Sequence, residues 1–488
     1  MRITISQDNR FSKLPMKIKS FLSVVGFLFV SGFLAQAQGA NPLNVVLIVA
    51  DDLGARDLKT HGSDLHETPH LDGFAASGIE FTRAYAAAPI CTPTRASIMT
   101  GKNPARLHMT IWSEHALRGP KLDKPMIPAD SEGNLPLEEI TLAERFKEAG
   151  YHTFHVGKWH LGEASSFPEV HGFDVNIAGH HWGAPPTFFA PYKGVVYDEM
   201  RYVPDLHGLK EGEYLPDRLT TEAIKLMKNA GDTPFFLNLC YFVPHVPIDG
   251  KSEYVEDFAS RIGPDNRHRN PGYAAMVKSL DDGVGRILEW LKQSGKDENT
   301  VVIFVSDNGG YTGKWDGETV NSNAPLRAGK GTLYEGGIRI PWFMRIPGIK
   351  KASKVDVPVT TTDILPTLLD LAGLDHPEFD GSSLKPLLYK KHFNNGKTRP
   401  LVFHYPHYYS GTTPVSALRK GDLKLLQYYT PEGLRFELYD LSKDPSESNN
   451  LAEDREAIVK EMRAELNTSL WEMGANFPRI NPEYESKK

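Results

Sequence analysis

Four oxygen-bearing side chains follow directly after two apolar runs of the sequence. Asp51 and Asp52 come after the first run, and Asp307 and Asn308 come after a later one. Carboxylate and amide oxygens are hard ligands, which favour Ca²⁺ or Mg²⁺ over zinc. The alternative is that these residues only cap turns, since Asp-Asn-Gly-Gly is a good turn sequence. If both runs end at one place, the pattern indicates a site for a divalent cation.

A cysteine in an unusual setting is the candidate nucleophile. Cys91 opens the segment Cys-Thr-Pro-Thr-Arg, which ends at Arg95 and continues as Ala-Ser-Ile-Met-Thr-Gly. A short motif alone has a real false-positive rate. A buried cysteine beside a turn proline is the structural alternative.

Two further kinds of residue suit acid–base chemistry and anion binding. Lys158 and His160 stand in Gly-Lys-Trp-His-Leu-Gly, where side chains two residues apart can face one ligand. His245 lies between two prolines, which limit its backbone. Lys330 is flanked by glycines that allow close approach to a tetrahedral anion. Each could instead be a solvated lysine or a histidine with an ordinary hydrogen bond.

These sequence segments occur along the chain in the order found in one protein family, and together they span most of residues 44–452. The chain resembles the type I (formylglycine-dependent) sulfatases of the alkaline phosphatase-like superfamily, among them bacterial and lysosomal carbohydrate sulfatases. The resemblance implies that Cys91 is oxidised to formylglycine by a formylglycine-generating or anaerobic sulfatase-maturating enzyme. The family commonly has Ser at the position of Thr94, but a hydroxyl is retained and modification is still expected. The resemblance also implies one Ca²⁺, bound by Asp51, Asp52, modified Cys91, Asp307 and Asn308.

The implied activity is hydrolysis of a sulfuric ester. Arg95, Lys158 and Lys330 would neutralise the sulfuryl oxygens, which is the largest expected catalytic contribution. His245 would protonate the leaving oxygen. His160 would take a proton from the second hydroxyl of the hydrated formylglycine as sulfate leaves.

Two other functions fit parts of the pattern. A phosphonate monoester or phosphodiester hydrolase of the same superfamily can also use formylglycine, but such enzymes tend to place His where this chain has Asn308. An inactive glycan-binding relative belongs to another functional class, but every expected catalytic position is filled here.

The order of apolar patterns predicts an α/β fold. Continuous apolar runs are typical of parallel strands covered on both faces, and here they alternate with helical patterns. After residue 385 short strands predict a small antiparallel sheet with one helix. The predicted catalytic domain is 41–385, and the predicted C-terminal subdomain is 386–488. The expected strands are 44–50, 152–156, 235–241, 301–306, 401–405, 415–419, 423–429 and 436–439, and the expected helices are 137–149, 218–229, 273–291, 361–373 and 455–471, with one more beginning near Thr94.

The first residues predict export. Basic residues precede an apolar run, and small residues up to Ala37 complete a secretory signal peptide over 1–37, although Met16 is an alternative start. The mature protein is then secreted or periplasmic and has no membrane span. Without the leader the chain has 50 basic and 60 acidic residues, a formal net charge of −10. This charge argues against nucleic acid as a partner. Cys91 and Cys240 are the two cysteines, so no internal disulfide is expected once Cys91 is modified.

The substrate is expected to be a sulfated glycan, with a sugar of the galactose or N-acetylgalactosamine type. Trp can stack on a sugar ring, and His or Arg can bind hydroxyls or a second sulfate. These residues could equally pack loops, and no adjacent acid at ligand spacing supports a zinc site. The candidate sugar contacts are His115, Arg118, His180, His181, Trp182, His404 and His407.

Overall fold

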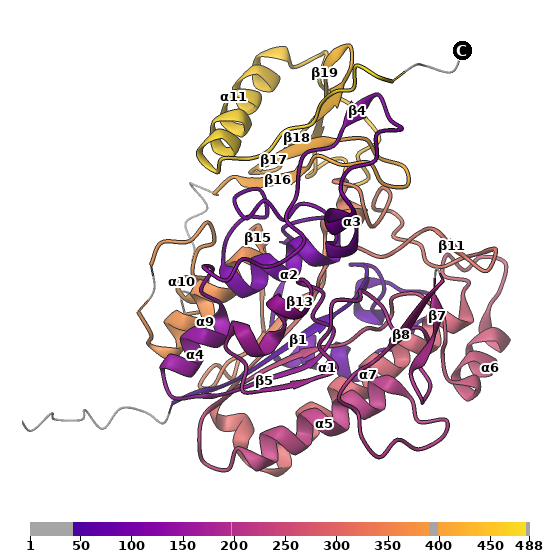
Figure 1. The fold of residues 1–488 in the computed structure, drawn as a ribbon, viewed down its shortest axis with the longest axis vertical. Coiled ribbons are helices and arrows are strands. Elements are labelled where there is room, and N and C mark those ends of the chain that lie inside the picture. Colours follow the sequence, from indigo (N-terminus) through magenta and orange to yellow (C-terminus); the bar gives the residue numbers. More distant parts are fainter. Residues whose placement is uncertain (1–41, 197, 376, 390–398, 485–488) are drawn as a thin grey trace, which may run out of the picture. The chain divides into compact units, whose positions relative to one another are not determined.

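An eight-stranded sheet forms the centre of the fold, in the order β14-β2-β13-β10-β1-β9-β5-β6 (Figure 1). The computed structural model describes residues 42–196, 198–375, 377–389 and 399–484, so the predicted signal peptide lies outside the described residues. Neighbouring strands run parallel except where β13 meets β10 and β2. The expected large, mostly parallel sheet is confirmed. Its strands are β1 (Asn44–Ala50), β2 (Ile79–Phe81), β5 (His152–Gly157), β6 (Val175–Ile177), β9 (Phe235–Cys240), β10 (Thr300–Ser306), β13 (Trp342–Arg345) and β14 (Ser353–Val355).

Helices cover both faces of this sheet. All seven residues of β1 are buried. Val46 and Ile48 join one hydrophobic cluster, and Val45 and Leu47 join another, as the alternation of side chains along a strand requires. Helices α1, α5 and α7 supply the first cluster, and α2, α4 and α9 supply the second, from opposite sides of the sheet (Figure 1). These helices are α1 (Pro69–Ser77), α2 (Cys91–Thr100), α4 (Leu142–Glu148), α5 (Leu215–Asn229), α7 (Pro271–Gln293) and α9 (Ile364–Ala372).

A four-stranded antiparallel sheet and helix α11 follow in the C-terminal part, as predicted. One face of this sheet packs on α11 through Leu418 and Leu425. The other face joins a cluster with Tyr85, Ile90 and Leu333 from the preceding part of the chain. The predicted boundary at residue 385 stays a prediction, and α10 (Lys385–Tyr389) spans it. The elements of the second sheet are β16 (Leu401–Tyr405), β17 (Val415–Lys420), β18 (Leu423–Thr430), β19 (Gly433–Asp440) and α11 (Glu456–Glu472).

Several helices begin at other residues than predicted, among them α4 and α5. Helix α4 begins at Leu142, because Thr141 and Glu144 form a reciprocal capping box that fixes the first turn. Helix α5 begins at Leu215, and Pro216 lies in its first turn, where a missing N–H costs no helical hydrogen bond.

The remaining described elements are short. Two hairpins, β7–β8 and β11–β12, have no counterpart in the predicted elements. These elements are β3 (Ala84–Tyr85), β4 (Met126–Ile127), β7 (Lys193–Val196), β8 (Glu199–Tyr202), β11 (Lys314–Trp315), β12 (Glu318–Thr319), β15 (Val359–Thr360), β20 (Arg479–Ile480), α3 (Ser113–Arg118), α6 (Ser252–Arg261) and α8 (Glu335–Ile338), with single 3₁₀ turns at Lys59–His61, Ala164–Ser166, Pro168–His171, Lys296–Asn299 and Thr361–Asp363.

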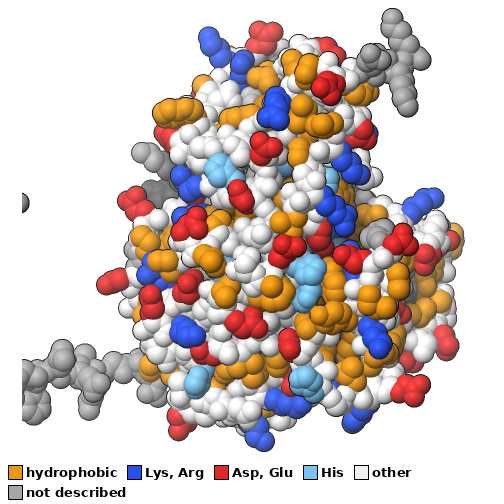
Figure 2. Space-filling model, viewed as in Figure 1, with side chains coloured by type: hydrophobic (Ala, Val, Ile, Leu, Met, Phe, Trp, Pro, Cys, Tyr) orange, Lys and Arg blue, Asp and Glu red, His pale blue; other side chains and the backbone are white. Residues whose placement is uncertain are grey.

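The surface shown in Figure 2 mixes charges of both signs. Lys and Arg side chains lie scattered among Asp and Glu, and apolar side chains occur between them. Within the described part of the chain, no helix has the length and apolar character needed to cross a bilayer.

A buried ion cluster joins the C-terminal sheet to the segment before β13. Lys424 on β18 is fully buried, and its Nζ lies 3.0 Å from Glu335 and 2.8 Å from Glu447. Oε2 of Glu447 accepts the backbone N–H of Glu335 at 2.6 Å. Burial raises the pKa of Glu447 to about 7, although Lys424 opposes this. The cluster therefore depends on the one ammonium group between two carboxylates.

We expect Lys424→Met to destabilise the protein by about 3 kcal/mol, because it leaves the buried carboxylate of Glu447 without its cation, while Glu335 keeps Arg339 at 3.6 Å. Lys420→Met is the matched control, since Lys420 is half exposed and bridges surface glutamates on α11. Urea unfolding of both variants measures the difference. Equal unfolding midpoints would show that the buried cluster contributes no more than a surface bridge.

Candidate active site

The carboxyl ends of four adjacent parallel strands, β10, β1, β9 and β5, lie at one edge of the large sheet. Ala50 pairs with Ser306, so the acidic residues that follow β1 and β10 start side by side. The backbone continues this pairing, because Asp307 N donates to Ala50 O at 3.1 Å and Lys158 N donates to Cys240 O at 2.8 Å. Ligands of open α/β sheets bind at this edge.

The two acidic strand ends form one buried cluster. Asp52 N donates to Oδ1 of Asp307 at 3.1 Å, and Asn308 Nδ2 donates to Oδ1 of Asp52 at 2.8 Å. Asp51, Asp52, Asp307 and Asn308 are all buried, and within the described part of the chain Oδ1 of Asn308 has no hydrogen-bond partner. An amide oxygen left without a partner beside three carboxylates is the donor set that a hard cation uses. These residues therefore fit a divalent cation.

Each carboxylate of the cluster also meets a buried cation. Lys158 Nζ lies 2.7 Å from Asp51, and Lys330 Nζ lies 2.8 Å from Asp52. Nη2 of Arg95 lies 2.9 Å from Oδ2 of Asp307, the third acidic residue of the cluster. Burial of three carboxylates is tolerable here because three basic side chains are buried with them.

These charges set the pKa values of the acids. Burial raises the pKa of Asp51 to about 7, although Lys158 opposes the shift. Burial would also raise the pKa of Asp52, but Lys330 and then His245 outweigh it, and the pKa of Asp52 falls below its usual range. The pKa of Asp307 is lowered as well, because Arg95 outweighs its burial.

Cys91 is the first residue of helix α2, whereas the predicted helix began near Thr94. Its Sγ lies 3.4 Å from Oδ1 of Asp51 and 3.9 Å from Oδ1 of Asp52. Burial raises the pKa of the Cys91 thiol well above its ordinary value. An unmodified Cys91 is therefore protonated at neutral pH and a weak nucleophile. Thr94 Oγ1 donates to Ala88 O at 3.0 Å, so its hydroxyl links the first turn of the helix to the segment before it.

The two predicted histidines flank the acidic cluster. Nε2 of His245 lies 3.6 Å from Asp52, and Nδ1 lies 2.6 Å from the carbonyl oxygen of Val246. Burial lowers the pKa of His245 to about 3, and Lys330 contributes. Nε2 of His160 lies 2.6 Å from Glu114, a residue that the sequence did not indicate.

A pocket of about 780 Å³ opens onto this cluster. Asp52, Cys91, His160, His245 and Lys330 lie among its walls, and Arg118 is the one predicted sugar contact that lines it. Its other walls hold residues that sequence reasoning missed, because they come from separate loops and hairpins with no common motif: Trp112, Glu114, Arg201, Tyr311, Lys314, Trp315 and Tyr409.

The other predicted sugar contacts lie elsewhere. His404 is buried in β16, and its ring nitrogens contact Ser416 and Asn476, so it has no free group for a ligand. His115 and His407 line a separate cavity of about 140 Å³. In the 180–182 segment the three rings contact one another at tilted angles and do not line the large pocket, although the carbonyl oxygen of His180 accepts the His160 N–H at 3.0 Å.

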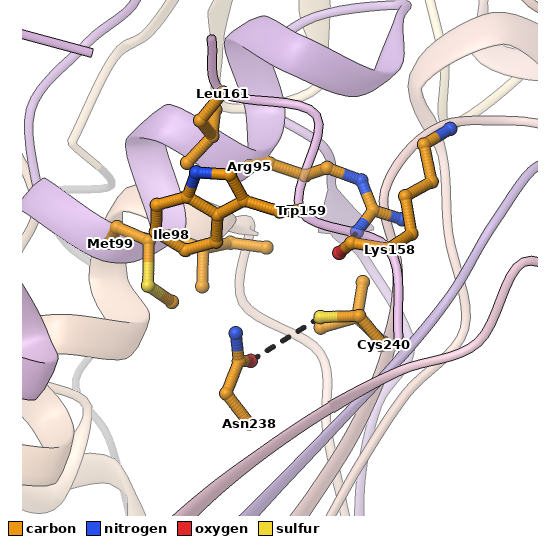
Figure 3. Close-up of a pocket in the computed structure, with 9 residues that line it drawn as sticks. Arg95, Ile98, Met99, Lys158, Trp159, Leu161, Asn238 and Cys240 are labelled. Carbon is orange, nitrogen blue, oxygen red and sulfur yellow. Dashed lines mark hydrogen bonds between the residues drawn. The ribbon is translucent and has the colours of Figure 1, made fainter. Parts of the chain in front are cut away.

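A much smaller cavity of about 10 Å³ lies behind the cluster (Figure 3). Arg95, Asn238 and Cys240 line it, and Cys240 Sγ contacts Oδ1 of Asn238 at 3.4 Å. The side chain of Lys158 runs away from this cavity. The space is about that of one water molecule, so Cys240 fills core as predicted.

Comparison with known proteins decides the family. The sulfatase family model matches residues 43–374, which is more than half of the chain. This chain belongs to the sulfatase family. The model of the C-terminal part of N-sulphoglucosamine sulphohydrolase matches residues 329–475 of the same sulfatase, from the Lys330 segment through the second sheet.

Relatives and solved structures agree with this family. A sulfatase of Formosa agariphila is 30% identical, with 95% of this chain and 96% of that protein covered. N-acetylgalactosamine-6-sulfatase of Rattus norvegicus is 34% identical, with 80% and 72% covered. The crystal structure of Ps i-CgsB in complex with k-i-k-neocarrahexaose is 29% identical, with a TM-score of 0.73 and 91% and 94% covered. The protein is a sulfatase with the alkaline phosphatase-like fold.

Gly331 lets the Lys330 segment pass beneath Tyr409 of the C-terminal part. Its φ is +84°, and an added Cβ would lie 2.0 Å from Cδ1 of Tyr409. We expect Gly331→Ala to lower kcat/KM for an aryl sulfate about a hundredfold, because a shift of about 1 Å in Lys330 misplaces an anion-binding group.

Gly348→Ala is the matched control, since Gly348 has a φ of +81° and no atom within 4 Å of the added Cβ. Both variants share the backbone cost of about 1 kcal/mol for a left-handed residue that is not glycine. Activity of Gly331→Ala equal to that of the control would show that contact with Tyr409 does not position Lys330.

Proposed function

We propose that this sulfatase releases sulfate from a sulfated carbohydrate, with formylglycine at position 91 and one calcium ion. The observation that carries the proposal is the position of Cys91. It begins a helix, points its sulfur at Asp51 and Asp52, and opens onto a pocket whose walls include Lys330. A helix N-terminus and buried cations both favour an anion at this place.

The donor set supports calcium. Asp51, Asp52, Asp307, Asn308 and the modified side chain at position 91 would hold the ion, and all four unmodified donors supply oxygen. A divalent cation held there would supply Lewis-acid stabilisation of the negative charge that develops on the sulfuryl group. The alternative of a phosphonate monoester or phosphodiester hydrolase is less well supported, because Asn308 occupies the place where such enzymes tend to have His.

The basic residues fit the charge that develops during sulfuryl transfer. Lys158, Lys330 and Arg95 are rigidly held and buried, so they stabilise sulfuryl oxygens without reorganising. His245 lies in the pocket wall beside Asp52, where a bound anion would raise its lowered pKa, so that it would give a proton to the leaving oxygen. His160 lies in the same pocket wall and would accept a proton as sulfate is released.

The walls of the pocket suit a sugar. Trp112, Tyr311, Trp315 and Tyr409 offer aromatic faces around a fully buried acidic and basic floor. Arg118 is exposed at the same pocket and can contact a sugar hydroxyl or a second anionic group. A galactose or N-acetylgalactosamine sugar is our choice, supported by the likeness to N-acetylgalactosamine-6-sulfatase. An inactive glycan-binding relative would not need the complete set of cations on the pocket floor.

Export and maturation complete the proposal. The predicted signal peptide would bring the protein to the periplasm or outside the cell, where sulfated glycans occur. A formylglycine-generating or anaerobic sulfatase-maturating enzyme would modify Cys91 before that. Cys240 is then the remaining thiol.

We expect Cys91→Ala and Cys91→Ser to lose at least about 10³-fold in sulfate release while the unfolding temperature stays close to that of the parent, because neither side chain can regenerate an aldehyde. The formylglycine mass on the peptide that contains position 91 should be present only in the parent. Cys240→Ala is the control, since Cys240 is also buried but lies outside the pocket wall. Parent-like turnover by Cys91→Ala would overturn the proposed chemistry, and an unmodified parent peptide would favour an inactive relative.

Removal of the metal ligands should remove calcium and activity together. We expect Asp307→Ala to lose stoichiometric calcium in elemental analysis and to lose activity, and a chelator should have the same effect on the parent. Asp356→Ala is the control, because Asp356 pairs with Arg83 at the surface. Full activity of the metal-free parent would contradict the proposal. Two bound zinc ions would instead favour the phosphonate or phosphodiester alternative.

A further inference from the structure

Glu114 places a carboxylate in the wall of a pocket that must receive an anion. Among the described residues that line this pocket, Asp52 is the other acid, and Lys330 neutralises it at 2.8 Å. Among the described residues, Glu114 pairs with His160 and with no Lys or Arg. Its side chain is 17% exposed, so its negative charge needs another explanation.

The contacts of Glu114 point to His160. Oε2 lies 2.6 Å from Nε2 of His160, and Oε1 accepts the backbone N–H of Gly183 at 3.1 Å. Both carboxylate oxygens are therefore engaged, and the Gly183 bond fixes the direction from which the carboxylate approaches the ring. Burial would raise the pKa of Glu114, but His160 outweighs it and lowers that pKa, so the residue is ionised.

Neighbouring groups hold the backbone of His160 and one of its two ring nitrogens. Its φ is +60°, which is rare for a residue other than glycine. Its carbonyl oxygen accepts from Thr92 at 2.8 Å, and its N–H donates to His180. An added Cβ at Gly183 would lie 2.5 Å from Cε1, so the Gly183 backbone lies against the ring. Nδ1 is buried and has no hydrogen-bond partner among the described residues.

These contacts select one form of the ring. An ionised carboxylate only accepts hydrogen bonds, so Nε2 must carry the hydrogen in the short bond to Glu114. In the neutral ring Nδ1 then has the lone pair. When Nδ1 takes a proton, the imidazolium stays next to a negative charge that is already in place.

We infer that Glu114 is a positioning residue that keeps His160 with hydrogen on Nε2 and leaves Nδ1 as the proton-accepting atom during sulfate release. The inference rests on the proposed function, in which His160 is the base of that step. Nδ1 takes the proton of the free hydroxyl on the modified side chain at position 91, as the C–O bond to sulfate breaks and the aldehyde C=O forms. His160 later returns this proton to water, and Glu114 transfers none. Other residues would bind calcium and the sulfuryl group.

Substitution of Glu114 by Gln tests this assignment. A Gln amide can accept or donate at Nε2, so the form of the ring is no longer fixed. In ¹⁵N spectra of histidine-labelled protein, we expect the parent to show His160 with hydrogen on Nε2 and Glu114→Gln to show a mixture or the other tautomer. We expect kcat for an aryl sulfate to fall about a hundredfold, within the usual range for a general base, with KM within about twofold.

Ser113→Ala is the structural control. Ser113 Oγ donates to Gly133 O at 2.6 Å and anchors the same helix α3 without contact to His160. It should leave the ¹⁵N shifts of His160 and kcat near those of the parent. If Glu114→Gln does not fold, Glu114→Asp, which keeps the charge one methylene away, replaces it and should show a smaller loss of kcat with the parent tautomer.

Three results would overturn the inference. They are an unchanged tautomer, a tautomer change without loss of kcat, and a rise in KM alone, which would make Glu114 a substrate contact. Failure of the proposed function is recognised separately, because it would appear as activity of Cys91→Ala while the ¹⁵N result for Glu114→Gln is unaffected.

Discussion

Burial of charge at the ends of β1 and β10 is the constraint on which the rest of the site depends. Three carboxylates with almost no exposure would be prohibitively costly alone. Lys158, Lys330 and Arg95 each approach one of them to within 3 Å and come from three different segments of the chain. The acids therefore determine where those segments can lie. Fixed charges of this kind need no reorganisation when an anion arrives.

The large sheet and the C-terminal sheet together hold these charged side chains in place. Register between β1 and β10 places Asp51 beside Asp307, and the ends of β9 and β5 add His245 and Lys158. The Lys330 segment is not on a strand of the large sheet. It is held instead by contacts with the C-terminal part, through Glu335 and Lys424 on one side and Tyr409 on the other. The C-terminal sheet is thus part of the site, although it supplies few of the reacting groups.

Residues with a local signature could be predicted from the sequence, and residues placed by loops could not. Asp51 and Asp307 follow continuous apolar runs, which indicate both the strands and the edge at which they end. Glu114 has no such signature, because its partner His160 is 46 positions away and the two meet only through a short helix. His404 is a predicted sugar contact because it lies in a polar and aromatic segment and His can bind hydroxyls, but in β16 both ring nitrogens bond inside the C-terminal part. Residue type in a polar segment cannot distinguish a histidine with buried hydrogen-bond partners from one that binds a ligand.

The arrangement of charged groups at the site also explains how an acidic protein can bind an anionic substrate. The predicted mature chain has a formal net charge of −10, which repels sulfate esters at long range but is screened beyond about 8 Å at physiological salt. Within the pocket the local balance is what counts. The three carboxylates and three basic side chains of the floor cancel formally, so a divalent cation held by the same carboxylates would leave the floor positive. Glu114 keeps its negative charge in that field while His160 is neutral, and the charge is compensated when His160 takes a proton during sulfate release. A carboxylate can therefore lie beside an anion-binding site when it stabilises a proton that moves during the reaction.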